Sequence, residues 1–402
     1  MENFSGSYKQ TKTTEFLINL NKFIFVFGLP NCWVDNLDFP VIFMKVLNVL
    51  SIYGNWSVII MNIFEYGSIY TQNNLSELQK SDLMLFLISH TIINGFRIRI
   101  CHQRDQIRNV MYKLGIALKA VHNDCEAEQK MITRSKFFSW ALIFNCVMSV
   151  IMYTIEGVLR VIRTGDTFNT VITAWPDVHD RSVLSNIGRT VIYVTWWIYL
   201  TRIFSVYSLV ICLTIAVSHQ FKNLKSYFYS LSKIFENDNV SQTEKEQEYE
   251  KAFKVGISMH SETLKCTDEI QTICREVFSG QIIFNLTLLI VLMYQMMNSP
   301  RTFSNVLTLG LTALTILFST GFFMWNAGDI TVEAEGVPVA MFSSGWENCY
   351  HESSVRVRKL VVISMSQAQK AVALTGLGII ALSYQSYVSI VKSSYSVFSV
   401  LY

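Results

Sequence analysis

Hydrophobic residues in this chain are gathered into seven long runs, which are separated by stretches rich in charged and polar residues. The runs cover approximately residues 41–64, 80–97, 137–160, 190–217, 277–298, 304–327 and 369–400. A helix rises about 1.5 Å per residue, so about 20 mostly apolar residues cross the hydrocarbon core of a bilayer. The second run is the most polar, since Asp82, His90 and Arg97 lie close to it or within it. The pattern predicts an all-α, polytopic membrane protein with seven transmembrane helices.

Composition and proline positions agree with this prediction. Hydrophobic residues make up 51% of the chain and charged residues only 16%, whereas soluble domains carry about 25% charged residues. Proline kinks or breaks a helix, and all five prolines stand at or outside the ends of the runs, so we expect continuous spans. The shorter apolar run 23–29 ends at Pro30 and lacks a signal-peptide cleavage site. We interpret it as an amphipathic or re-entrant segment.

The distribution of Lys and Arg gives the spans a direction. If the N-terminus is cytoplasmic, the inner segments are 1–40, 98–136 with Arg97, 218–276 and 328–370, and they hold 24 of the 33 basic residues. The outer segments then hold six, and three lie within spans. Basic residues flanking spans are retained on the cytoplasmic side. The bias therefore predicts a cytoplasmic N-terminus and an extracellular C-terminus.

No arrangement of residues typical of an enzyme or a metal centre occurs in the sequence. The chain lacks a Walker A loop, a dinucleotide-binding glycine motif, a nucleophile elbow and a His-Glu-x-x-His motif. None of its eight cysteines falls in a predicted outer loop, and the eight-residue separation of Cys266 and Cys274 does not match metal-ligand spacing. The net charge of +3 indicates no general affinity for nucleic acid. We expect no catalysis, cofactor, metal or external disulfide.

The segment 218–276 reads as two helices joined by a turn. Asn237-Asp238-Asn239 is a turn sequence, and the flanks 221–236 and 244–276 have helical periodicity. We expect the flanks to extend the fourth and fifth spans into the cytoplasm.

The last fifth of the chain carries several short motifs in a fixed order. They are Ala340–Trp346, Arg358–Leu360, Met365–Lys370, Leu374–Gly376 and Ile390–Phe398. This set resembles the C-terminal signature of insect odorant receptors. In that signature a small-residue stretch and a Trp precede an Arg/Lys-Lys helix, an Arg-Ala-Gln-Lys-Pro-like segment, Leu-Thr-Ala-Gly and Leu-Lys-x-Ser-Tyr-Ser-x-Phe. The chain departs from it at Gln367, Ala371 and Leu377, where Arg, Pro and the run Leu-Thr-Ala-Gly are usual.

Other classes of membrane protein fit less well. Gustatory receptors share the fold, but their last span usually carries Thr-Tyr and ends in Gln-Phe, whereas this chain has Ser394-Tyr395-Ser396. The odorant receptor co-receptor has a longer segment between spans four and five than 218–276. A G-protein-coupled receptor predicts an external N-terminus, and a transporter predicts internal repeats with broken helices. The resemblance favours a ligand-tuned odorant receptor subunit, with a gustatory-receptor-like channel or, less favoured, a G-protein-coupled receptor as the alternatives.

The resemblance implies a subunit of an odorant-gated, non-selective cation channel in the plasma membrane of olfactory sensory neurons. Four subunits, including the odorant receptor co-receptor, surround one pore that is lined by the outer part of span seven. Val400 matches the position of the family's hydrophobic gate, and Ser396 and Ser393 lie near it on the same helix. A hydrophobic ring closes a pore by excluding water. The cytoplasmic ends of spans four to seven are expected to form a helical anchor.

The resemblance also places an odorant pocket in the outer halves of spans two to six. A volatile ligand is small and mostly apolar, so it fits an aromatic-lined cavity with few polar groups. The candidate lining residues are Phe86, Tyr153, Gly157, Tyr193, Trp196, Trp197 and Tyr294. For each aromatic residue, bundle packing or the interfacial belt is the alternative.

The expected organisation has three parts. Residues 1–40 form a cytoplasmic N-terminal segment with the possible re-entrant helix, and 41–327 contain spans one to six with the pocket and the long loop 218–276. Residues 328–402 contain the anchor helix and the pore-lining seventh span. The expected partners are the co-receptor, an odorant and membrane lipid.

The predicted orientation can be tested with an epitope tag at each terminus. In intact, unpermeabilised cells we expect antibody to stain the C-terminal tag and not the N-terminal tag. Permeabilised cells, in which both tags should stain, are the control. Staining of the N-terminal tag on intact cells would contradict the orientation and favour a G-protein-coupled receptor.

Overall fold

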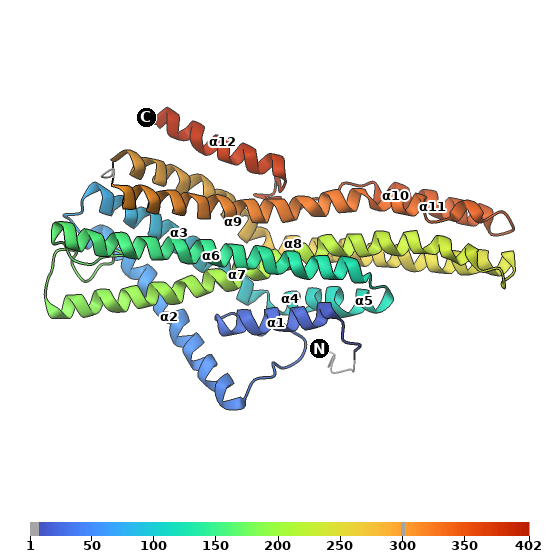
Figure 1. Ribbon diagram of the computed structural model, residues 1–402, viewed down its shortest axis with the longest axis horizontal. Helices are drawn as coiled ribbons and strands as arrows, with labels where there is room; N and C mark the ends of the chain where they lie inside the picture. The colour runs from blue at the N-terminus through green and yellow to red at the C-terminus, as the bar shows by residue number, and fades with distance from the viewer. Residues whose placement is uncertain (1–7, 299–301, 402) are drawn as a thin grey trace.

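The computed structural model describes residues 8–298 and 302–401, and it is mostly helical (Figure 1). The six longest helices are α2 (Val41–Thr71), α3 (Glu77–His102), α6 (Cys125–Thr164), α7 (Val183–Ser230), α8 (Gln242–Asn298) and α9 (Phe303–Glu335). The shorter helices are α1 (Lys12–Val26), α4 (Arg104–Tyr112), α5 (Leu118–Val121), α10 (Val337–Phe342), α11 (Ser354–Ala368) and α12 (Tyr384–Leu401). Single helical turns are η1 (Lys113–Ala117), η2 (Leu231–Glu236) and η3 (Trp346–Asn348), and two short strands are β1 (Thr375–Gly376) and β2 (Ile380–Ala381).

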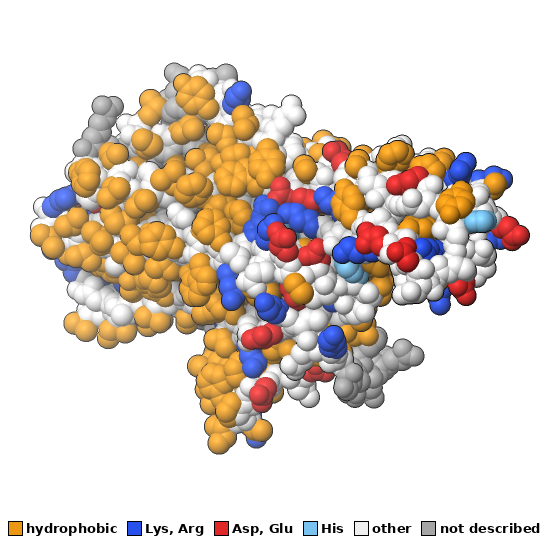
Figure 2. Space-filling model, turned by 45° about the vertical axis from the view of Figure 1, so that its right-hand side comes forward, with side chains coloured by type: hydrophobic (Ala, Val, Ile, Leu, Met, Phe, Trp, Pro, Cys, Tyr) orange, Lys and Arg blue, Asp and Glu red, His pale blue; other side chains and the backbone are white. Residues whose placement is uncertain are grey.

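Six helical segments of the described chain are long and apolar enough to cross a membrane. They contain the first six hydrophobic runs, which confirms an all-α, polytopic membrane protein. Hydrophobic side chains cover most of one end of the molecule, whereas charged side chains gather toward the end that carries α10 and α11 (Figure 2). The seventh expected span corresponds to α12, an 18-residue helix rich in serine that contains Lys392.

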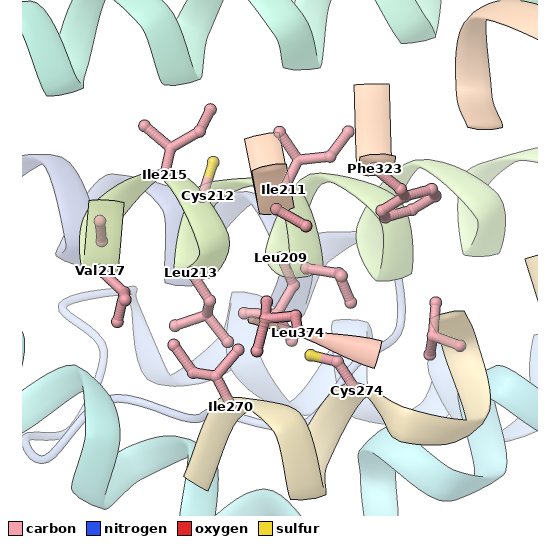
Figure 3. Packing of buried hydrophobic residues seen from close by; sticks show 14 of the residues in the cluster. Leu209, Ile211, Cys212, Leu213, Ile215, Val217, Ile270, Cys274, Phe323 and Leu374 are labelled. Carbon is pink, nitrogen blue, oxygen red and sulfur yellow. The ribbon is translucent and has the colours of Figure 1, made fainter. Parts of the chain in front are cut away.

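Helix α7 is the centre of the bundle. Within its most apolar window 89% of the residues are buried, against 17% for α2. Side chains on several faces of α7 contact other elements, and Figure 3 shows Leu209 and Leu213 near Ile270 and Cys274 of α8, with Leu374 between them. A helix that is apolar on all faces is buried all round. The remaining long helices therefore pack around α7.

The seventh span begins later than the sequence indicates. We expected a helix from residue 369, but 369–383 instead contain a β-hairpin, and α12 begins at Tyr384. The backbone of Leu377 and Gly378 has positive φ angles of 55° and 75°, which a continuing helix excludes. The side chain of Gln271 in α8 bonds both backbone groups of Thr375, as acceptor from N at 2.7 Å and as donor to O at 3.0 Å.

The loops 98–136 and 218–276 are largely helical in the structure. The turn at 237–239 is observed, and η2 and α8 flank it, so spans four and five continue as extended helices as predicted. The sequence analysis assigned no secondary structure to the loop 98–136, which contains α4, η1 and α5. Its buried Ile107, Val110 and Met111 pack in the main core. Ile107, Val110, Met111 and Leu114 follow the i, i+3, i+4, i+7 spacing of a helix, and this spacing was the sequence signal for the segment.

The end of the molecule that carries α10 and α11 is fastened to α8 by buried polar contacts. The carboxylate of Glu246 accepts hydrogen bonds from the backbone N–H groups of Tyr350 at 2.7 Å and His351 at 2.8 Å. One turn further along α8, the hydroxyl groups of Tyr249 and Ser344 are 2.5 Å apart. Both α8 side chains are fully buried. These contacts join the segment 344–351 to α8, in the region where the sequence analysis expected a helical anchor.

Replacing Glu246 by Gln tests the anchor. Gln keeps the shape but turns two charge-assisted hydrogen bonds into weaker neutral ones, so we expect a loss of roughly 1–3 kcal/mol of stability. Thermal unfolding of the purified full chain, with Glu248→Gln as the exposed control on the same helix, measures the difference. Equal melting temperatures for the two variants would contradict a stabilising role for Glu246.

Candidate functional site

An internal cavity of about 120 Å³ lies among α3, α6, α7, α8 and α9. Each of these helices contributes side chains to its wall, and most of the wall is apolar. Leu85, Cys146, Val150, Leu200, Phe284 and Ile316 are among the lining residues. Buried, mostly apolar cavities with a few polar groups are the usual form of small-molecule sites.

Three of the predicted pocket residues meet at this cavity from three different helices. Phe86 of α3, Tyr153 of α6 and Trp196 of α7 all line it. The ring centroid of Phe86 lies 5.3 Å from the ring centroid of Tyr153 and 5.3 Å from that of Trp196. The interplanar angles are 66° and 80° respectively. Edge-to-face pairs of this kind are stabilising and fix the orientation of each ring. The cluster forms a rigid aromatic wall.

The other four predicted pocket residues do not line the cavity. Gly157 faces the loop that follows α6, since a Cβ atom there would lie 3.2 Å from Cε2 of Phe168. The ring of Tyr193 packs on Phe168 and on Trp197, at centroid distances of 5.6 and 6.4 Å. The hydroxyl group of Tyr294 donates to Glu77 at the outer end of α3, at 3.4 Å.

Most hydroxyl groups in the cavity wall are already bonded within their own helix or to a neighbouring helix. Ser89 donates to the carbonyl of Phe86 at 3.0 Å, and Thr312 donates to the carbonyl of Thr308 at 2.8 Å. The hydroxyl groups of serine and threonine in helices commonly donate to a backbone carbonyl of the preceding turn. The buried hydroxyl group of Tyr153 has no hydrogen-bond partner among the described residues. A bound molecule would meet a mostly apolar surface with this hydroxyl group and one imidazole.

That imidazole belongs to His90, which sequence reasoning had noted only as a polar residue in span two. Its Nδ1 is 2.5 Å from the carboxylate of Glu65 in α2, and both side chains are buried. The second oxygen of Glu65 accepts from Asn62 at 3.0 Å, and the backbone carbonyl of His90 accepts from Tyr199 at 2.8 Å. The bond to Glu65 fixes the imidazole, and Nε2 has no hydrogen-bond partner among the described residues.

A hydrogen-bond network closes the inner end of the cavity. The side-chain oxygen of Gln281 in α8 accepts from Tyr207 of α7 at 2.7 Å, and its nitrogen donates to Ser319 and Thr320 of α9, both at 3.0 Å. Tyr207 and Ser319 also line the cavity. Within a membrane, such groups have only protein partners, so this network holds three helices in one register.

The expected gate residues lie on α12, which packs against α8 and α9. The hydroxyl groups of Ser393 and Ser396 donate to carbonyls one turn back, at 2.9 and 3.0 Å, and both residues are exposed in the single chain. Val400 lies in the same helix, but its side chain is outside the described part of the structure. The structure does not bring these residues near the cavity residues named above.

A larger hollow of about 440 Å³ lies between α2, α7 and the loop before α7. Its walls include Ile60, Trp175, Leu184 and Val191, all of which are more than 45% exposed. In a bilayer these side chains face lipid. The smaller cavity is the better candidate, because its walls are buried.

The arrangement defines a class of protein: a multi-pass helical membrane protein with an enclosed apolar site. A model of the 7tm odorant receptor family matches residues 83–395, which is most of the chain, and the chain therefore belongs to this family. The fold is similar to that of the insect olfactory receptor OR5 from Machilis hrabei, with a TM-score of 0.78, 13% identity, and coverage of 97% of this chain and 98% of that one. A structure of that receptor in complex with eugenol matches equally well, at 12% identity. A comparison with curated protein sequences finds no match.

Proposed function

We propose that this protein is the odorant-binding subunit of a ligand-gated, non-selective cation channel. It assembles with the odorant receptor co-receptor in the plasma membrane of olfactory sensory neurons. Membership of the odorant receptor family supports the receptor role. The observation that carries the proposal is the enclosed apolar cavity at Phe86, Tyr153 and Trp196.

The cavity selects for small ligands. Its volume of about 120 Å³ is close to that of an engineered apolar cavity of about 150 Å³ that holds benzene. Larger molecules require the aromatic wall to move. The imidazole of His90, held by Glu65, gives such a ligand one hydrogen-bonding position at Nε2, so the preferred odorant is small, mostly apolar and carries one polar atom.

Helix α8 provides the connection from the cavity to the pore helix. Gln281 closes the inner end of the cavity, and the next residue, Ile282, packs against the hairpin, since a Cβ atom on Gly376 would lie 2.5 Å from its Cδ1. The hairpin leads directly into α12, where Val400 forms the gate with Ser396 and Ser393 nearby. A ligand opens the gate only if it binds the open state more tightly. We propose that filling the cavity shifts α8 and, through the hairpin, moves α12 outward.

Two neighbouring tryptophans test the site. Trp196 lines the cavity, whereas Trp197 does not. With the co-receptor co-expressed under voltage clamp, we expect Trp196→Leu to raise the half-maximal concentration of an activating odorant about tenfold, which corresponds to ~1.4 kcal/mol of lost contact. Trp197→Leu, the matched control, should stay within about twofold.

Two results would contradict the proposal. Absence of odorant-evoked cation current across a broad panel of volatiles, with both subunits at the cell surface, would oppose the channel assignment. Equal shifts for Trp196→Leu and Trp197→Leu, with a functional channel, would oppose the cavity as the binding site but leave the channel assignment intact.

A further inference from the structure

Two arginines are buried side by side within the bundle and are not among the residues that line the odorant cavity. Arg97 of α3 is 6% exposed and Arg202 of α7 is 5% exposed. They are close enough to interact electrostatically with each other and with Cys101. In the predicted orientation Arg97 stands at the inner end of its span, whereas Arg202 lies near the middle of the run 190–217. Like charges that are buried together repel each other more strongly than they would in water.

Neither arginine has a counter-charge. Among the described residues, neither guanidinium group forms an ion pair or a hydrogen bond, and the Nε atom of each is buried without a partner. The Nε atom of Arg99, two residues from Arg97 on α3, is also buried without a hydrogen bond, but it lies 3.1 Å from the carboxylate of Glu276, so this arginine has a counter-charge. Burial of an unpaired charge is very costly, so buried arginines normally have an anionic partner.

Two glycines hold the chain close to Arg202. A Cβ atom on Gly28 would lie 1.7 Å from Nη1 of Arg202, and one on Gly54 would lie 2.6 Å from Nη2. Gly28 has a φ angle of 91°, which also favours glycine. The loop after α1 and the middle of α2 therefore approach the guanidinium group as closely as a backbone can.

Arg202 lies where α2 leaves the bundle. The buried residues of α2 are Gly54, Val58, Met61, Glu65 and Ser68, and none of residues 41–53 is buried. Figure 1 shows the N-terminal half of α2 standing apart from the other long helices, and Figure 2 shows the same protrusion covered by hydrophobic side chains.

We propose that Arg97 and Arg202 bind a phosphate group where α2 leaves the bundle. A phosphate carries the negative charge that the pair lacks, and its oxygens match the planar fork of arginine donors. The buried side-chain oxygen of Asn55, beside Gly54, also lacks a partner, but a neutral amide cannot balance two charges. The phosphate belongs either to a phospholipid headgroup or to a free phosphate ion.

Add-back of ligands to the lipid-stripped protein tests the site and identifies the source. The full-length chain is purified in detergent with any subunits that accompany it, and its melting is followed through a fluorescent tag. The three additions are phosphatidic acid, diacylglycerol with the same acyl chains, and inorganic phosphate. We expect phosphatidic acid to raise the melting temperature by about 3 °C and diacylglycerol to have no effect. An equal rise with inorganic phosphate would identify free phosphate as the ligand, and no rise with it would identify the lipid.

Substitutions of single arginines show which side chains the response to phosphatidic acid depends on. Arg97→Gln and Arg202→Gln should lose the response to phosphatidic acid, whereas Arg99→Gln, the matched control whose arginine is already paired, should keep it. Arg202→Lys keeps the positive charge but lacks the planar, two-pronged set of guanidinium donors. Phosphatidic acid should therefore raise its melting temperature only weakly. Native mass spectrometry of the unmodified chain, which should retain one phosphate-bearing molecule, does not depend on whether the variants fold.

The proposal is overturned if phosphatidic acid and diacylglycerol act alike on the unmodified chain, or if neither has an effect. It is also overturned if Arg99→Gln loses the response as fully as Arg202→Gln, because the effect would then be that of a general basic surface.

Discussion

The hydrogen bonds of Gln281 are the interaction on which the arrangement of this membrane bundle depends. A polar side chain surrounded by lipid and protein has no water to bond with, so its partners must come from neighbouring helices. Gln281 takes them from Tyr207 on α7 and from Ser319 and Thr320 on α9. These bonds fix the rotation of three helices at the inner end of the cavity. They also place the next residue, Ile282, against the hairpin that begins the seventh span.

Hydrophobicity alone could predict the spans but not how they face one another. The depth of a residue in the membrane can be estimated from its position along a span. Phe86, Tyr153 and Trp196 were chosen at a similar depth, and they meet in the structure. The face of α7 that reaches the cavity could not be predicted, because a helix that is apolar and buried all round has no polar side to mark its orientation. Trp197 and Trp196 were therefore equivalent in sequence and differ in structure.

Gly157 does not line the cavity, because the loop that carries Phe168 folds over it, and the path of a loop has no periodic sequence signal. The start of α12 was missed because the positive φ angles of Leu377 and Gly378 depend on the contact between this hairpin and α8.

Charged residues inside the bundle show two different solutions to the same problem. Glu65 and His90 satisfy each other beside the cavity, and the pair leaves one ring nitrogen for a ligand. Arg97 and Arg202 have no such partner within the described chain. Intramembrane ionisable residues are costly and often mark functional sites. We propose that they mark the odorant site in one case and a phosphate site in the other.

The central claim is that the odorant occupies the cavity walled by Phe86, Tyr153 and Trp196. An electron cryo-microscopy structure of this chain with the co-receptor, at a saturating concentration of an activating odorant, tests it most directly. The account predicts ligand density between these three rings, within hydrogen-bonding distance of His90. Density in the lipid-facing hollow between α2 and α7, with the cavity between the three rings unchanged, would contradict it.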